Sequence, residues 1–220
     1  MMWNKSSVAA RIDHTLLKPQ ATPAQIKTLC EEAAQYGFAS VCINPCYVRY
    51  AASCLKDTQV KVCTVAGFPL GAAMTDVKAC EAKYAADAGA EEIDMVLNVG
   101  MLKSGNFEYV HNDIAQVVSA VYGKAIVKVI LETCLLTDTE KEIACKLAAD
   151  ARAHFVKTST GFSTGGATAS DVRLMRASCG GLRVKAAGGI RTYADAVAML
   201  DAGADRIGAS ASLAIIDAAP

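Results

Sequence analysis

The amino-acid sequence predicts an α/β fold of the TIM-barrel class, a (β/α)8 barrel that occupies residues 1–220 as a single domain. Short β-rich runs alternate with longer amphipathic stretches along the whole chain, as in proteins built from strand–helix units. No Gly-x-Gly-x-x-Gly fingerprint is present, which favours a closed barrel over a doubly wound sheet. The length of 220 residues suits one such barrel and is too small for two.

Each expected strand is a short run rich in apolar and β-branched residues. Several runs are nearly uninterrupted, and residues 126–131 read Ile-Val-Lys-Val-Ile-Leu. Such runs are typical of parallel strands that are covered by helices. In chain order, the eight expected strands are residues 11–15, 39–44, 60–66, 92–98, 125–131, 153–159, 182–187 and 206–210.

Between these strands, the expected helices carry start and stop signals. A threonine three residues before a side chain that can bond back to it favours a helix N-terminus. Such threonines are Thr22, Thr137, Thr168 and Thr192. A glycine at the turn from helix to strand favours a helix end. Such glycines are Gly37, Gly89 and Gly203.

A short internal repeat supports the eightfold arrangement. The segment Asp-Ala-Gly-Ala at residues 87–90 recurs at residues 201–204, each time just before an expected strand. These two strands are the fourth and the eighth, which lie half a turn apart in a closed eight-stranded barrel. The spacing of the repeat therefore suits such a barrel.

The charge composition excludes several classes of partner. The 22 basic and 22 acidic residues give zero net charge, and no basic block or stripe is present. Neither nucleic acid nor an anionic membrane is therefore expected as a partner. Any anion that the protein binds must be held by a local site.

The N-terminal segment and the cysteines indicate a cytoplasmic protein. Residues 1–10 lack the long apolar stretch that a secretory signal or a membrane span would need. The nine cysteines are scattered without a Cys-x-x-Cys motif, and the three histidines are dispersed. This pattern favours reduced thiols and predicts neither a disulfide framework nor a metal site.

Loops rich in glycine and hydroxyl groups follow the last three expected strands. In barrels of this class the active site lies at the carboxyl ends of the strands, and phosphate is often bound after the seventh and eighth. Glycine lets backbone N–H groups approach an oxyanion closely. A plain turn or a flexible linker is the alternative for each loop alone, whereas the loops together favour phosphate binding. The candidate binding residues are Thr160, Gly161, Gly188, Gly189, Gly208 and Ser210.

Two lysines lie near the ends of the sixth and seventh expected strands. Lys157 follows Phe-Val and Lys185 follows Arg-Val, so on neighbouring strands their ammonium groups could lie close together. Burial and a nearby like charge each lower the pKa of a lysine, and only the neutral amine attacks a carbonyl. The pair is therefore predicted to act in nucleophilic catalysis. The alternative is a pair of lysines that extend past the barrel mouth into water.

Asp94 is the third catalytic candidate, because it lies among aliphatic residues on the fourth expected strand. A buried carboxylate needs a cation or a hydrogen-bond donor. Facing two lysines, Asp94 could transfer protons directly or through water, and a structural salt bridge is the alternative. Lys128 and Glu132 are expected to share this interior, whereas a structural role is expected for His14 and an inert thiol for Cys42.

Four segments together resemble the deoxyribose-phosphate aldolases, a family of Schiff-base-forming enzymes. Residues 155–161 (FVKTSTG) resemble the family's Schiff-base strand, and residues 184–191 (VKAAGGIR) resemble its second-lysine and phosphate segment. Residues 93–98 (IDMVLN) resemble its aspartate strand, and residues 12–17 (IDHTLL) its N-terminal signature. The resemblance extends over nearly the whole chain.

This resemblance implies reversible cleavage of 2-deoxy-D-ribose 5-phosphate to D-glyceraldehyde 3-phosphate and acetaldehyde. It implies that Lys157 forms the imine, that Lys185 tunes it and that Asp94 takes part in proton transfer. It also implies that no cofactor or metal is needed and that the protein is a homodimer. The sequence departs from some members at Phe162, where they carry a lysine, and this departure implies weaker phosphate binding.

The residues by themselves leave two other functions open. A phosphate-binding barrel isomerase or synthase could use the same aspartate and lysines as acid and base. A non-catalytic sugar-phosphate sensor could use the same glycine-rich loops. Borohydride separates these functions from an aldolase, because only an imine-forming enzyme is covalently trapped with its substrate.

Overall fold

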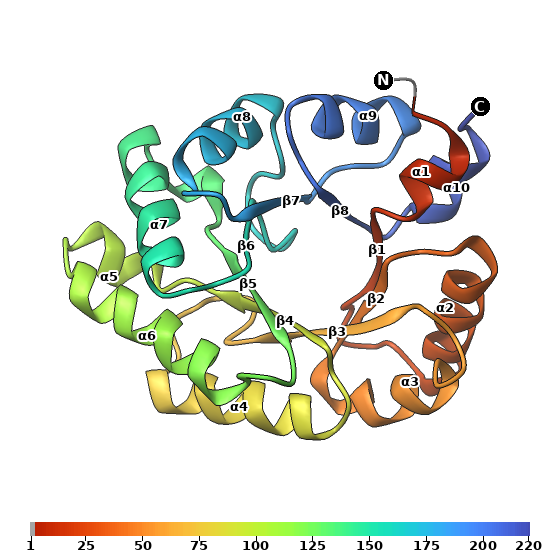
Figure 1. Cartoon of the computed structure of the whole chain (residues 1–220), viewed down its shortest axis with the longest axis horizontal. Helices are drawn as coiled ribbons and strands as arrows, with labels where there is room; N and C mark the ends of the chain where they lie inside the picture. Colours follow the sequence, from red (N-terminus) through yellow and green to blue (C-terminus); the bar gives the residue numbers. More distant parts are fainter. Residues whose placement is uncertain (1–2) are drawn as a thin grey trace.

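The computed structural model describes residues 3–220 as a closed barrel of eight parallel strands (Figure 1). Met1 and Met2, which belong to the predicted domain, lie outside the described residues. The strands follow one another around the barrel in chain order, and β8 closes the barrel by pairing with β1. The strands are β1 (Ile12–Leu16), β2 (Ser40–Ile43), β3 (Lys61–Ala66), β4 (Glu92–Val96), β5 (Ile126–Ile130), β6 (Phe155–Lys157), β7 (Arg183–Ala187) and β8 (Arg206–Ala209). The predicted fold class is confirmed, and no predicted strand end is more than two residues from the observed one.

Helices surround the barrel and connect its strands (Figure 1). The Lys5 N–H donates to the Pro220 carbonyl at 3.1 Å, so the two ends of the described chain meet beside α1 and α10. The helices are α1 (Lys5–Ala9), α2 (Pro23–Tyr36), α3 (Val48–Cys54), α4 (Thr75–Asp87), α5 (Val99–Lys103), α6 (Phe107–Ala120), α7 (Asp138–Asp150), α8 (Ala169–Ser178), α9 (Tyr193–Asp201) and α10 (Ser212–Asp217), with 3-10 turns η1 (Pro45–Tyr47) and η2 (Thr133–Leu135). Within residues 3–220, no helix has both the length and the apolar character needed to cross a membrane.

The predicted helix signals lie at observed helix ends. Reciprocal capping boxes form at the starts of α2, α7 and α9, around Thr22, Thr137 and Thr192. Thr168 caps α8 only by accepting the Asp171 N–H. Gly37 ends α2 with φ of 68°, a left-handed conformation that glycine adopts without strain. Gly89 and Gly203 follow the last cap residues of α4 and α9, also with positive φ.

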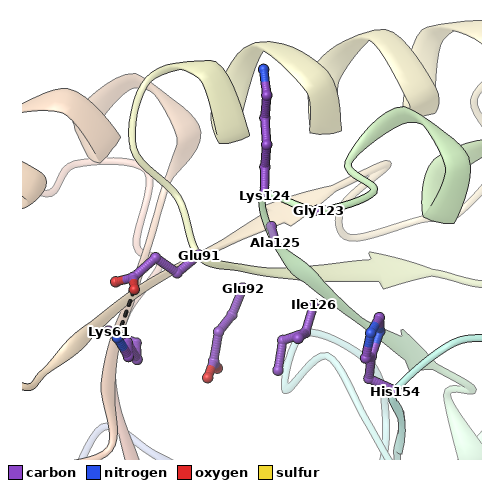
Figure 2. Close-up of a pocket in the computed structure, with 8 residues that line it drawn as sticks. All are labelled: Lys61, Glu91, Glu92, Gly123, Lys124, Ala125, Ile126 and His154. Atoms are coloured by element: carbon purple, nitrogen blue, oxygen red, sulfur yellow. Dashed lines mark hydrogen bonds and ion pairs between the residues drawn. The ribbon is translucent and has the colours of Figure 1, made fainter.

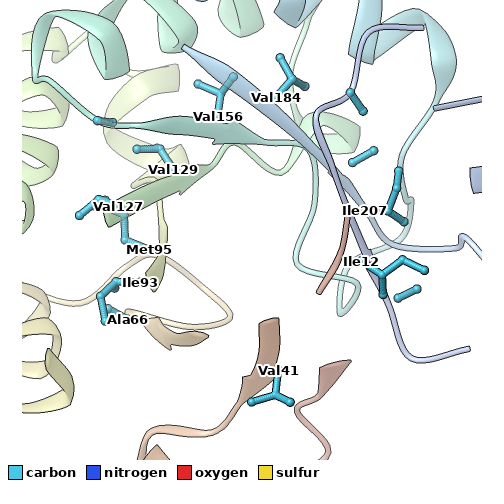
Figure 3. Packing of buried hydrophobic residues seen from close by; sticks show 14 of the residues in the cluster. Ile12, Val41, Ala66, Ile93, Met95, Val127, Val129, Val156, Val184 and Ile207 are labelled. Carbon is cyan, nitrogen blue, oxygen red and sulfur yellow. The ribbon is translucent and has the colours of Figure 1, made fainter. Parts of the chain in front are cut away.

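The outer face of the strands carries the main hydrophobic core. Ile12, Val129 and Ile207 belong to one buried cluster with helical residues such as Ile26 and Met175. Figure 3 shows the strand residues of this layer. Each fully buried aliphatic side chain stabilises the fold by roughly 1.5–3 kcal/mol. The packing of helices onto the outside of the barrel is therefore the main source of its stability.

The inside of the barrel is charged. Successive strand residues point to opposite faces, so the neighbours of the outward aliphatic residues point inward. The fully buried charged residues of the strands are Asp13, Asp94, Lys128 and Lys185. Barrels of this class are usually filled by layers of branched aliphatic side chains. Because burying charge is costly unless it is paired, this interior is a candidate for function.

Candidate active site

The adjacent strands β6 and β7 place two lysines side by side. Lys157 is the last residue of β6 and is the direct register partner of Lys185 on β7. Both side chains are almost fully buried, with 3% and 0% of their surface exposed. The structure therefore brings the two predicted lysines into one confined space.

Asp94 joins these lysines from the facing strand β4. Its Oδ2 lies 2.8 Å from Lys157 Nζ and 2.7 Å from Lys185 Nζ, and its Oδ1 lies 2.8 Å from Lys128 Nζ. Burial alone would raise the pKa of the Asp94 carboxyl, but the three ammonium groups hold that pKa well below its ordinary value. Asp94 is therefore an ionised acceptor that collects the three lysines.

Further ion pairs continue from this group toward the amino end of the barrel. Asp13 lies 2.5 Å from Lys185 and 2.5 Å from Arg206. Glu92 lies 2.6 Å from Lys128 and 3.2 Å from Arg206. Three carboxylates and four cationic side chains are thus linked in one buried cluster, which we call the ionic cluster. Its members are Asp13, Glu92, Asp94, Lys128, Lys157, Lys185 and Arg206.

The ionic cluster keeps Lys185 and Lys128 protonated. Burial by itself lowers the pKa of Lys185, but the carboxylates of Asp13 and Asp94 outweigh burial and raise that pKa above its ordinary value. The pKa of Lys128 is raised for the same reason, chiefly by Asp94 after the opposing effect of burial. Two fixed positive charges therefore lie next to Lys157 at neutral pH.

A cavity of about 380 Å³ lies over Lys157 at the carboxyl end of the barrel. It crosses the ends of β6, β7, β8 and β1, which are consecutive around the barrel. All the predicted binding residues line it together with Lys157: Thr160, Gly161, Gly188, Gly189, Gly208 and Ser210. Asp94 and Lys185 are buried below Lys157 and contact it there. The structure thus joins the predicted catalytic and binding residues at one site, and we call this cavity the upper cavity.

The loops after β6 and β7 form one ordered wall of the upper cavity. Gly161, Gly188 and Gly189 have φ of 83°, 92° and 79°, a region that other residues rarely adopt. The Ala167 N–H donates to the Gly188 carbonyl at 3.0 Å, and a Cβ at Gly166 would collide with that carbonyl. The loop after β6 is therefore packed against its neighbour and is not a loose linker.

A buried glutamate fixes the start of the β6 loop. The Thr160 N–H donates to Glu132 Oε1 at 3.2 Å, and the Thr160 hydroxyl donates to Glu132 Oε2. Glu132 thus holds a loop at the strand ends, although the sequence analysis expected it to share the polar interior with Lys128. Farther along, Phe162 packs edge to face on Phe68 with ring centroids 5.2 Å apart. Phe162 lines the upper cavity with an apolar ring.

Two groups of potential metal ligands lie inside the barrel. The sulfur atoms of Cys42 and Cys63 and an oxygen of Asp94 are within 4.8 Å of one another, and a second group, also containing Cys63, includes Glu92. Lys128 Nζ lies 2.8 Å from Asp94, 2.6 Å from Glu92 and 3.3 Å from Cys63. Its ammonium group already supplies the positive charge between these donors, so the residues fit a metal dication poorly. The absence of a metal requirement stays a prediction.

His14 lies outside the upper cavity lining. Its Nδ1 pairs with the Ser212 hydroxyl at 2.9 Å, and its Nε2 pairs with the Glu32 carboxylate at 2.7 Å. Burial lowers the pKa of His14 despite the opposing effect of Glu32. Both ring nitrogens are satisfied, as the expected structural role requires.

The sequence analysis did not assign the lower part of the ionic cluster or two cations at the cavity. Glu92 lies two residues before Asp94 on β4, and Arg206 begins β8. The alternation of strand residues could have placed Glu92 on the inward face with Asp94. Lys18 and Arg191 line the upper cavity from loops, where no alternation indicates the direction of a side chain.

A second cavity, of about 390 Å³, lies at the opposite end of the barrel, near the amino ends of β3 to β6 (Figure 2). We call it the lower cavity. Two lysines and two glutamates line it, and Lys61 and Glu91 form an ion pair of 2.7 Å. The predicted catalytic residues meet at the other end, so we assign the candidate active site to the upper cavity.

Comparisons with known proteins show the class of enzyme to which this protein belongs. The protein is an aldolase, because the family model described as DeoC/LacD family aldolase matches residues 7–218. The chain therefore belongs to the DeoC/LacD aldolase family.

Relatives and solved structures agree with this assignment. The deoxyribose-phosphate aldolase of Clostridium kluyveri is 62% identical over 215 residues, which cover 97% of this chain and 99% of the relative. That of Caldanaerobacter subterraneus subsp. tengcongensis is 60% identical and is covered over 93% of its length, with 96% of this chain. The tetrameric deoxyribose phosphate aldolase of Aeropyrum pernix has a TM-score of 0.91 and 38% identity, over 97% of this chain and 91% of that one.

Proposed function

We propose that this protein reversibly cleaves 2-deoxy-D-ribose 5-phosphate to D-glyceraldehyde 3-phosphate and acetaldehyde, with Lys157 as the Schiff-base nucleophile. The observation that carries the proposal is the position of Lys157, which lines the upper cavity while its Nζ lies 2.8 Å from Asp94. A lysine can form an imine only where its amine meets both the substrate and a proton-transfer group. The names of the two relatives described above support this substrate.

The position of Lys157 in the ionic cluster favours it as the reactive lysine. With all its groups ionised, the cluster has four positive charges and three negative ones. Lys185 supplies a like charge on the neighbouring strand and keeps its own proton, because its pKa is raised by Asp13 and Asp94 despite burial. Lys157 is the lysine of the ionic cluster that also lines the upper cavity, so it is the one placed to react with a substrate there.

The reaction follows from these residues. The Lys157 amine adds to the C1 aldehyde, and loss of water gives an iminium ion, whose nitrogen accepts the electron pair of the breaking C2–C3 bond. Asp94 takes part in transfer of the C3 hydroxyl proton, directly or through water. Glyceraldehyde phosphate leaves, the enamine is protonated at C2, and water releases acetaldehyde from Lys157. The iminium serves as the electrophile, so the proposed reaction needs no metal or cofactor.

The glycine-rich loops are proposed to bind the phosphate at the other side of the upper cavity. Gly188 and Gly189 after β7, Gly208 and Ser210 around the end of β8, and Gly161 after β6 all line this space. Their backbone N–H groups can donate to an anion without side chains in the way. A sugar phosphate that spans the cavity would therefore present its aldehyde to Lys157.

Four further predictions stand beside this proposal. We propose that residues 1–220 act as one catalytic domain and that the protein is cytoplasmic. We also propose a homodimer, and we expect no nucleic acid or membrane partner. Zero net charge supports the last expectation.

Covalent trapping tests the proposed nucleophile. Incubation with acetaldehyde and borohydride, followed by peptide mass mapping, should place a two-carbon adduct on Lys157. The variant Lys157→Met should lose both the adduct and the activity with deoxyribose phosphate, by about 10³-fold or more, because the covalent route is removed. An adduct mainly on Lys185, or no adduct with either lysine, would contradict the assignment. A sugar-phosphate sensor or a non-imine isomerase would give no adduct.

A further inference from the structure

The ionisable residues that line the upper cavity are all basic. They are Lys18, Lys157 and Arg191, and no aspartate or glutamate of residues 3–220 lines this space. The whole protein has zero net charge, so this concentration of positive charge is local. Such a lining favours an anionic ligand, because a carboxylate in the wall would repel it.

Lys18 is placed beside the proposed phosphate loops. It lies just beyond the end of β1, which pairs with β8 through His14 and Ala209, so its loop borders the loop of Gly208 and Ser210. Around the barrel, Lys18 and Phe162 therefore flank the phosphate loops from opposite sides. The apolar Phe162 leaves the β6 side without a cation, whereas Lys18 supplies one from the β1 side.

The backbone at Lys18 is fixed while its ammonium group is unpaired. The Lys18 carbonyl accepts the Asn44 side-chain amide at 3.2 Å and the Ala21 N–H at 3.1 Å, which ties the loop to the turn after β2. Within residues 3–220 no carboxylate lies within ion-pair distance of Lys18 Nζ. A ligand anion thus has no protein carboxylate to displace there.

The other two cations are less available to a phosphate. Lys157 contacts Asp94 and is proposed to react with the aldehyde end of the substrate. The Arg191 backbone N–H donates to Asp195 Oδ2 at 3.1 Å, and this bond together with the positive charge of Arg191 lowers the pKa of the Asp195 carboxyl, so an acidic group lies close to Arg191. Lys18 lies outside the proposed bond-breaking chemistry, and within residues 3–220 its ammonium group has no carboxylate partner.

We propose that Lys18 binds the substrate phosphate and sets the preference of this enzyme for phosphorylated over unphosphorylated sugar. The proposal rests on the proposed function. It assigns to Lys18, in the loop after β1, the positive charge at the phosphate that Phe162 does not provide. Lys18 is a binding residue in this account, since it stabilises substrate and transition state alike. Its loss should therefore raise KM much more than it lowers kcat.

The test compares Lys18→Gln and Lys18→Arg with the wild type. The ratio of kcat/KM for 2-deoxy-D-ribose 5-phosphate to that for 2-deoxy-D-ribose should fall about 10-fold in Lys18→Gln, because a partly exposed charge-assisted contact is lost. Lys18→Arg should recover most of the ratio. The affinity for inorganic phosphate, measured by isothermal titration, should fall in Lys18→Gln and be restored in Lys18→Arg.

A matched control removes the same charge elsewhere. Lys146 is exposed on α7 and does not line the upper cavity, so Lys146→Gln changes the net charge equally. It should keep both the substrate ratio and the phosphate affinity. The proposal is overturned if Lys18→Gln keeps them too, or if Lys146→Gln loses as much.

Phosphate titration also separates this proposal from the proposed function. If the wild type cleaves neither sugar while phosphate binding still depends on Lys18, the proposed reaction is wrong and the phosphate assignment stands. If the wild type cleaves deoxyribose phosphate but phosphate affinity is independent of Lys18, the reaction stands and this inference fails. Circular dichroism spectra of the variants check that each remains folded.

Discussion

The two ends of the barrel carry cavities of nearly equal volume whose linings differ in charge. The upper cavity, of about 380 Å³, is lined by three cations and by glycines with positive φ. The lower cavity, of about 390 Å³, is lined by two lysines and two glutamates, and its Lys61–Glu91 pair is visible in Figure 2. Volume therefore does not distinguish the site. The unbalanced charge does, because only the upper lining has positive charge left for a ligand.

Buried lysines of this protein show the same contrast on a smaller scale. Lys78 on α4 is fully buried, and its Nζ bonds to Asp113 at 2.6 Å and to the Val96 carbonyl at 3.0 Å. The Lys78 ammonium group thus shares its carboxylate partner with no other lysine of residues 3–220. Lys157 shares the carboxylate of Asp94 with two other lysines and also meets a cavity. Burial alone is thus compatible with a structural role, whereas incomplete pairing beside a cavity indicates chemistry.

Among the tests of this comparison, the largest effect is expected when one positive charge below the upper cavity is removed. Lys185→Leu should lower kcat/KM at pH 7 by about 10²–10³-fold, because it removes the fixed positive charge beside the proposed reacting amine of Lys157. Activity should recover partly as the pH rises, and the acidic limb of the pH–rate profile should move to higher pH. The wild-type Lys185 charge is constant over that limb, because the Asp13 and Asp94 carboxylates raise its pKa against the effect of burial. The profiles of both proteins measure the shift.

Lys185→Arg is the matched variant for this prediction. It keeps the charge and should retain more activity at neutral pH than Lys185→Leu, although space is limited because a Cβ at Gly208 would already lie 3.1 Å from Lys185 Cε. Thermal unfolding checks the fold of both variants, since Lys185→Leu removes one cationic partner from Asp13 and one from Asp94. If the acidic limbs of wild type and Lys185→Leu coincide, Lys185 transfers protons or positions groups directly, and the charge account is wrong.

A smaller effect is expected when one negative charge is added to the upper cavity. Gly189→Asp and Gly189→Asn have the same shape and the same strain at φ 79°, and a Cβ there meets no atom within 4 Å. They differ in charge and in the amide NH2 group that replaces one carboxylate oxygen. The aspartate should attract the cations that the phosphate needs and should lower kcat/KM for deoxyribose phosphate about 10- to 100-fold below that of the asparagine variant.

The comparison substrate for this pair is unphosphorylated deoxyribose. Its kcat/KM should differ much less between Gly189→Asp and Gly189→Asn, since it has no anion to repel. Equal differences for both sugars would argue that the loop after β7 does not bind phosphate.

Much of this barrel could be predicted from local sequence patterns. Strands such as β5 are apolar runs, because both of their faces are buried, and their position in the chain can be read from those runs. The start and the end of α2 are indicated by the capping box at Thr22 and by Gly37. The closure of β8 onto β1 follows once eight such units are present. Strand runs and helix caps depend on residues that are close together in the sequence, so they can be predicted from the sequence alone.

The ionic cluster depends on contacts between distant residues, and the sequence analysis recovered it only in part. Lys157, Lys185 and Asp94 were identified because each stands out in an apolar strand. Asp13 was given no role, because its partners Lys185 and Arg206 are far from it in the chain and meet it only when the barrel closes. The side-chain direction of a loop residue such as Lys18 has no periodic signal at all.

The smallest effect is expected at the lower cavity, and it tests the other half of the comparison. Lys61 and Glu91 have side chains that are 48% and 45% exposed, and pairs of this kind contribute about 0–1 kcal/mol to stability. Lys61→Met and Glu91→Gln should therefore each keep kcat/KM within about twofold for both sugars, since a surface pair contributes little even to stability. Steady-state kinetics and thermal unfolding of the two single variants and of the double variant measure this.

Glu92 makes this test sharper, because it lines the same lower cavity but also belongs to the ionic cluster. Its carboxylate lies 2.6 Å from Lys128, which in turn lies 2.8 Å from Asp94. Glu92→Gln should therefore lower both stability and activity, whereas Glu91→Gln, its neighbour in the chain, should lower neither strongly. A tenfold loss of activity in Glu91→Gln would mean that the lower cavity is coupled to the upper one. The charge of the residues that line each cavity would then not distinguish a functional cavity from a non-functional one. The assignment of function to the upper cavity alone would be wrong.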